Sequence, residues 1–118
     1  MTRTLALSFV LMLTWSASTV WADARSDARA QVGFGIVVAQ RGLWQEARYR
    51  FERAVSIDPT YAEAHNDLAI AYEQLGLVDQ ARESYKKALA LDPRNIVIRG
   101  NFDFYEELHA QDRSDHRR

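Results

Sequence analysis

The sequence has 118 residues, of which 47% are hydrophobic and 26% are charged, a composition typical of a single globular domain. Its 15 Lys and Arg side chains nearly balance 16 Asp and Glu, and a formal net charge of −1 argues against a dedicated nucleic-acid-binding protein. The chain has no cysteine, which excludes disulfides, thiolate catalysis, Cys-based zinc sites and a lipidated cysteine.

Residues 1–22 have the pattern of a signal peptide, and we expect them to lie outside the folded domain. An apolar run at residues 5–13 (LALSFVLML) follows a single basic residue, and Val20 and Ala22 loosely match the small residues that signal peptidase requires before its cleavage site. We expect cleavage after Ala22, which makes the mature chain periplasmic or secreted. Two alternatives stay open: cleavage after Ala24, or an uncleaved segment that anchors the chain in the inner membrane.

A repeat of 34 residues organises the rest of the chain. Residues 28–61 align with residues 62–95 with 11 identities in 34 positions. Self-similarity at such a period is typical of an array of like supersecondary units. The most informative pairs are Gly42-Leu43 with Gly76-Leu77, Ala47-Arg48 with Ala81-Arg82, and Asp58-Pro59 with Asp92-Pro93.

Each unit is predicted to hold two helices, because apolar residues recur at helical spacing on both sides of a glycine. The first helix of each unit should end at Gly42 or Gly76, since glycine readily adopts a positive φ. The second should end at Asp58-Pro59 or Asp92-Pro93, because proline lacks an amide donor and restricts the residue before it. In the first helix of the first unit, we expect Phe34 and Val38 to form the apolar stripe.

Small residues recur where the two helices of a unit are expected to cross. They should let the paired helices approach closely, while Phe51 and Tyr85 fill the space between one pair and the next. The small residues are Gly35 and Ala69 in the first helices and Ala47 and Ala81 in the second.

These residues resemble the tetratricopeptide repeat family over residues 28–95. The second unit matches the family pattern at His65, Leu68-Ala69, Tyr72, Gly76, Ala81, Tyr85, Ala88 and Pro93. The first unit matches at Gln31, Phe34-Gly35, Val38, Gly42, Ala47, Phe51, Ala54 and Pro59. The sequence departs from the pattern at Gln31 and His65, where tryptophan is usual, and at Val38, where tyrosine is usual. The resemblance implies an all-α solenoid of antiparallel helix pairs.

A third unit begins but is not completed. Asn95 can cap a new helix, which we expect over residues 96–111 as a cap on the open end of the solenoid. The charged residues 112–118 are expected to form a disordered tail. The domain then covers residues 23–111 and holds about five helices. The apolar stripe of the capping helix is Ile98, Phe102, Tyr105 and His109.

No catalytic constellation is found in the sequence. The histidines at 65, 109 and 116 include no i, i+4 pair of the kind that binds a metal on a helix. The segment Gly33-Phe34-Gly35 lies inside a helical pattern and is not followed by Lys-Ser/Thr, so it is not a phosphate-binding loop. We therefore expect no enzymatic activity, no metal and no cofactor.

By the resemblance, the first helix of each pair lines a concave face that binds partners. On this face we expect an apolar strip of Val32, Ile36, Ile70 and Phe104 beside an acidic rim of Glu63, Asp67 and Glu73. Such a surface suits a peptide or helix with apolar anchors and basic flanks, although these acids can equally be a solvated face. The candidate partner-binding residues are Arg29, Val32, Ile36, Gln40, Glu63, Asn66, Asp67, Ile70, Glu73, Gln74, Asn101 and Phe104.

The resemblance also disfavours one kind of ligand. Chaperone-binding members of the family hold a C-terminal carboxylate with basic and amide side chains on these helices. The corresponding positions here are Gly33, Asp67 and Asn101, and an aspartate at the centre would repel a carboxylate.

The expected function is that of an adaptor or scaffold in the periplasm or outside the cell, with a protein or peptide partner and no nucleic acid. Membrane contact is expected only if the signal peptide is uncleaved. Two alternatives stay open. One is a structural unit that self-associates, because two and a half repeats fall short of the usual minimum of about three. The other is a membrane-anchored assembly factor.

Overall fold

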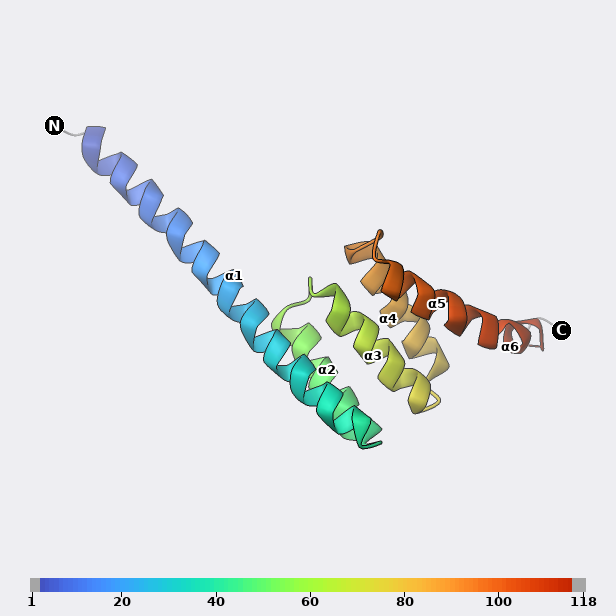
Figure 1. Ribbon diagram of the computed structural model, residues 1–118. Coiled ribbons are helices and arrows are strands. Elements are labelled where there is room, and N and C mark those ends of the chain that lie inside the picture. Colours follow the sequence, from blue (N-terminus) through green and yellow to red (C-terminus); the bar gives the residue numbers. More distant parts are fainter. Residues whose placement is uncertain (1–2, 116–118) are drawn as a thin grey trace.

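The computed structural model describes residues 3–115, and the side chains of residues 20–114. The predicted all-α solenoid is confirmed: two helical hairpins, α1–α2 and α3–α4, lie side by side, and α5 packs on α4 (Figure 1). No strand occurs in the described residues. The helices are α1 (Arg3–Gln40), α2 (Trp44–Ile57), α3 (Ala62–Gln74), α4 (Val78–Leu91), α5 (Ile96–Leu108) and α6 (Ala110–Asp115).

The helices of both hairpins end where the repeat predicts. Gly42 and Gly76 follow α1 and α3 with φ of 76° and 73°. The amide after each glycine closes the turn, and that of Leu43 donates to the Val38 carbonyl at 3.0 Å. Helices α2 and α4 end directly before the Asp-Pro pairs. Asn95 caps α5 as predicted, because its side-chain oxygen accepts from the amides of residues 97 and 98, both at 3.1 Å.

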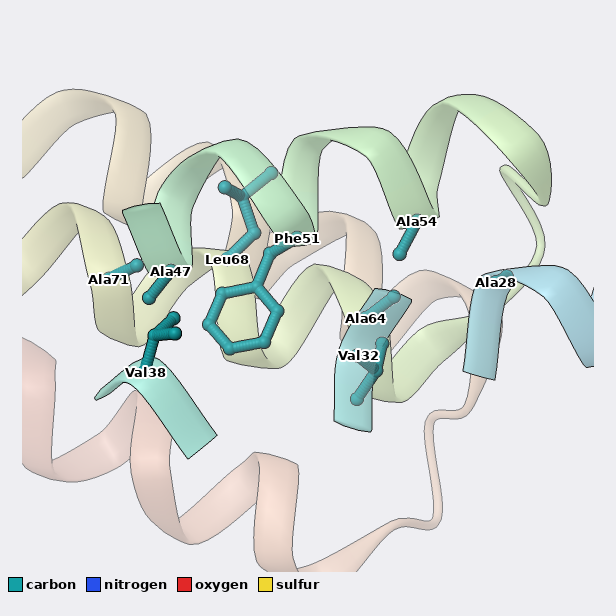
Figure 2. Close-up of a cluster of buried hydrophobic side chains, with 9 residues drawn as sticks. All are labelled: Ala28, Val32, Val38, Ala47, Phe51, Ala54, Ala64, Leu68 and Ala71. Atoms are coloured by element: carbon teal, nitrogen blue, oxygen red, sulfur yellow. The ribbon is translucent and has the colours of Figure 1, made fainter. Parts of the chain in front are cut away.

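The core of the first hairpin is built around Phe51 of α2, which is 2% exposed. In Figure 2 its ring points toward α1, between Val32 and Val38. A Cβ atom on Gly35 would lie only 2.5 Å from Cε1 of this ring, so the two helices cross closely because Gly35 has no side chain. The same cluster includes Ala64, Leu68 and Ala71 of α3. Phe51 therefore also fills the space between the hairpins, as predicted.

Helix α1 begins far before the first repeat and continues through residues 3–27 without a break. Its first half projects beyond the hairpins (Figure 1). The Ala- and Leu-rich composition of this stretch favours helix. A helix here is compatible with a cleaved signal peptide and with an uncleaved anchor, so removal of residues 1–22 stays a prediction. No helix in the part of the chain that the structure describes is both long and apolar enough to cross a membrane.

The C-terminal end differs from the expectation. Helix α5 ends at Leu108 rather than near residue 111, and a short sixth helix, α6, covers part of the predicted disordered tail. Interactions with α5 and within α6 explain the extra order: Arg113 forms an ion pair with Glu106, and Ser114 Oγ donates to the Gln111 carbonyl at 2.7 Å. The remainder of the predicted tail, residues 116–118, lies outside the described residues.

Candidate functional site

A hollow of about 310 Å³ opens between the two hairpins, on the side of the first helices. We call it the hollow. Its walls are mostly apolar and come from three helices, so it exists only because the hairpins pack together. It is lined by Ile36, Ala39 and Gln40 of α1, Trp44 and Phe51 of α2, and Asp67 and Ile70 of α3.

The repeat places equivalent side chains on both sides of this hollow. Ile36 of α1 and Ile70 of α3 occupy the same position in units 34 residues apart. Ile36 is 41% exposed, although burial of a large apolar side chain away from water is favourable. Since α1 and α3 are the first helices of the two hairpins, the two isoleucines form a pair of apolar walls that a partner could cover.

Asp67 is the acidic group among the polar lining residues. Burial raises the pKa of Asp67 to about 6; a hydrogen bond from Asn66 opposes this rise, and the negative charge of Glu63 adds to it. No basic side chain forms an ion pair with Asp67 within the described residues. The hollow therefore holds a carboxylate with no positive counter-charge.

A chain of amide side chains orients the donor to Asp67. Asn101 Nδ2 of α5 donates to Asn66 Oδ1 at 3.1 Å. This bond fixes the amide of Asn66, whose Nδ2 donates to Asp67 Oδ1 at 3.3 Å. Asn66 is 6% exposed, so it supports the site from beneath. The capping helix thus contributes to the geometry of the carboxylate although it does not line the hollow.

The structure brings four of the predicted residues together in the hollow, namely Ile36, Gln40, Asp67 and Ile70. Four others are exposed but do not line it: Arg29, Glu63, Gln74 and Phe104. Phe104 is 61% exposed on α5. The predicted apolar strip is therefore not continuous, and its accessible part is centred on the two isoleucines.

Two of the predicted positions need correction. Val32 is 6% exposed and belongs to the core, because four residues exceed one helical turn and rotate Val32 away from Ile36 and toward α2. Glu73 does not stand free at an acidic rim, since its Oε2 accepts a hydrogen bond from the Tyr85 hydroxyl of α4. Val32 is therefore not placed to contact a partner, whereas Glu73 is partly buried and held toward α4 by this hydrogen bond.

Trp44 and Phe51 line the hollow but are not among the partner-binding residues predicted from the sequence. The repeat pattern predicts Phe51 as a core residue, and in the structure Phe51 also lines the hollow. Trp44 is the first residue of α2, and the equivalent residue of the second unit is Val78. A large aromatic residue at one repeat's helix start and a small one at the other is a signal that could have indicated a feature particular to the first unit.

A second hollow, of about 300 Å³, lies at α4 and is lined mostly by polar and charged side chains. It contains no counterpart of the unpaired carboxylate in an apolar wall. Among the described residues, no group of three or more His, Asp or Glu side chains is placed to hold a metal ion.

The comparisons with known proteins agree with this architecture. A family model described as "Tetratricopeptide repeat" matches residues 38–100. The Arabidopsis OM64 TPR domain is similar in structure, with a TM-score of 0.69, 17% identity, and coverage of 75% of this chain and 73% of that one. The crystal structure of MamA gives a TM-score of 0.66 and 25% identity, and the match covers 71% of this chain but 49% of MamA. A search of curated proteins finds no significant match.

Proposed function

Because the chain belongs to the tetratricopeptide repeat family, whose fold typically serves protein–protein interaction, we propose that it is a non-catalytic adaptor that binds a short peptide or helix at the hollow. The partner presents a Lys or Arg side chain between apolar residues. Export to the periplasm or beyond belongs to the same proposal, and the pattern of residues 1–22 supports it.

The unpaired carboxylate of Asp67 carries this proposal. An apolar environment destabilises an ionised carboxylate, and a cation at a few ångströms reverses that cost. Lys and Arg have apolar stems and charged ends, so a stem can cover Ile36 and Ile70 while the charge reaches Asp67. The face of a tryptophan also attracts cations, which gives Trp44 a part in selecting a basic side chain. A carboxylate ligand would be repelled.

The test is a synthetic peptide library in which one position, flanked by aliphatic residues, is Lys, Arg, Gln, Leu or Glu. Trp44 fluorescence reports binding in the full chain when the other two tryptophans are changed, Trp15→Phe and Trp21→Phe. We expect the Lys and Arg peptides to bind most tightly. Asp67→Asn should remove this preference, whereas the control Asp103→Asn, an exposed acid on α5, should keep it.

Binding should also depend on pH with a defined sign. Only the ionised form of Asp67 attracts a cation, and with a pKa of about 6 the free protein holds the charge at pH 7 and loses it as the pH falls. We expect affinity for the Lys peptide to fall about tenfold between pH 7 and pH 5, and to stay constant for Asp67→Asn. Equal binding of Lys, Leu and Glu peptides to the wild type would refute the proposal.

A further inference from the structure

One face of α1 lacks the partner that its counterparts have. In α3 the equivalent stripe packs on the first hairpin, with Ala64, Leu68 and Ala71 no more than 5% exposed. In α5 the stripe packs on α4, and Ile98 and Tyr105 are at most 1% exposed. In α1, Phe34 and Val37 of the same stripe are 48% and 46% exposed. We call this stripe the end face; it consists of Asp27, Ala30, Phe34 and Val37 of α1, together with Arg41 in the turn that follows the helix.

The centre of the end face is supported from within the molecule. The guanidinium of Arg50 on α2 lies 4.2 Å from the centre of the Phe34 ring. Arg50 is in turn held by Glu46, whose Oε1 accepts from its Nε at 2.9 Å. Phe34 is therefore held in place on its α2 side while about half of its surface stays accessible.

Opposite charges stand at the two ends of this stripe. Asp27 lies seven residues before Phe34 and Arg41 lies seven residues after it. Both are exposed, and neither forms an ion pair within the residues that the structure describes. Asp27 lies nearly two helical turns before Phe34, or roughly 10 Å along the axis, whereas Arg41 is the first residue of the turn that follows α1. The two opposite charges therefore flank Phe34 at the two ends of this stripe.

We propose that the end face binds a second copy of this chain, as a symmetric dimer in which the two α1 helices run antiparallel. With the twofold axis at Phe34, Asp27 of each copy faces Arg41 of the other, and the apolar residues between them meet at the centre. A twofold interface uses the same patch on both copies, and this arrangement of charges complements itself only in the antiparallel direction.

The opposite end of the solenoid does not offer an alternative site for the end face. A helix following α5 would pack where the earlier units have Gly35 and Ala69, and α5 has Asp103 at that position, with Glu106 one turn further. Glu106 is already paired with Arg82. Head-to-tail stacking would bury these charges against apolar residues at high cost, so the face-to-face dimer is favoured.

The dimer leaves the hollow free. Ile36 comes two residues after Phe34 and thus points about 200° around α1 from it. Peptide binding at the hollow and pairing at the end face are therefore separate properties, and each can fail without the other.

Sedimentation of the full chain tests the dimer by exchange of charges. We expect the wild type to sediment at twice its 13.5 kDa mass. The variants Asp27→Arg and Arg41→Asp each place two pairs of like charges opposite one another in the dimer. Each should raise the dissociation constant of the dimer at least about tenfold. An equimolar mixture of these two variants should dimerise again, as should the double variant Asp27→Arg/Arg41→Asp. The control Arg53→Asp, an exposed site on α2, should behave as the wild type.

Circular dichroism shows whether each variant remains folded. We expect all of them to fold, because charge changes at exposed positions have little effect on stability. A wild type that stays monomeric at about 100 µM, where weak specific dimers form, would overturn the proposal. So would association that survives both single charge changes and Phe34→Asp, because another surface would then be responsible. Failure of the mixture to recover dimers would exclude the antiparallel geometry.

Discussion

Gly33 and Gly35 lie two residues apart on α1 and have opposite surroundings. A Cβ atom added at Gly33 would meet nothing within 4 Å, whereas one added at Gly35 would lie within 3.0 Å of three atoms of the Phe51 ring. The ring is 2% exposed and lies among the core side chains of the first hairpin and α3, which limits its movement away from α1. Alanine at Gly33 would change only the helix propensity of the backbone. Alanine at Gly35 would also disrupt the close packing of α1 on α2.

The variant Gly35→Ala should destabilise the protein, and Gly33→Ala should stabilise it. Alanine in a helix is favoured over glycine by about 0.5–1 kcal/mol, and at Gly33 nothing offsets that gain. At Gly35 the overpacking costs about 1–3 kcal/mol, which exceeds the gain. Urea unfolding of both variants measures the difference; two variants of equal stability would show that α1 and α2 do not cross at Gly35.

Among the elements, the helix boundaries could be predicted well because single residues determine them. Gly42 and Gly76 end helices through their φ, and Asn95 starts one through its side chain. The end of α5 was predicted less well. Its apolar stripe runs on through His109, but a change of backbone direction at that residue separates α5 from α6, and the ion pair of Arg113 with Glu106 is a tertiary contact without a local pattern.

Phe34 and its repeat equivalent Leu68 differ in burial, although the repeat pattern places them at the same position. The alignment of Phe34 with Leu68 predicts a core residue, yet Leu68 is 5% exposed and Phe34 is 48% exposed. The difference arises because Leu68 packs against the first hairpin, whereas no helix in the described part of the chain covers Phe34. A repeat pattern states which residues are equivalent, but their burial depends on where in the array the unit stands.

Residue Arg25 joins α1 to the loop between the hairpins, and no sequence pattern indicated this contact. Its guanidinium forms an ion pair with Asp58 and donates to Thr60 Oγ1 at 3.2 Å. It also lies 4.7 Å from the centre of the Tyr61 ring. Burial tends to raise the pKa of Asp58, but the hydrogen bonds from Thr60 and Arg25 outweigh it and lower the pKa below its ordinary value of 3.8.

We expect Arg25→Ala to lower the free energy of unfolding by about 1–3 kcal/mol, because the buried carboxylate of Asp58 loses a charged partner. The control is Arg29→Ala, an exposed arginine one turn further along α1. Since the native pKa of Asp58 is lowered, this contribution is present above pH 4 and is lost as acid protonates Asp58. Thermal melts at pH 7 and pH 3 measure it, and equal stability of the two variants at pH 7 would contradict it.

At the scale of the whole molecule, the solenoid could be predicted from the sequence and the hollow could not. The predicted face contained Ile36, Gln40, Asp67 and Ile70, because the repeat places them on one side of the first helices. The depth of the hollow depends on how Trp44 and Phe51 pack between the hairpins, and the unusual pKa of Asp67 depends on that depth. Both are properties of the assembled helices rather than of any segment.

The proposed export of the chain predicts a defined N-terminus for its mature form. Cleavage after Ala22 would shorten α1 to residues 23–40 and would leave Arg25 and the whole end face in the mature protein. The domain should then unfold at the same temperature as the full chain, because the ion-pair and core contacts of α1 lie at and after Arg25 among the side chains that the structure describes. Mass spectrometry of the protein from a periplasmic extract should find a chain beginning at Asp23. An intact Met1 on a membrane-bound species would show that the segment is an anchor, and a chain beginning at Arg25 would place the cleavage after Ala24.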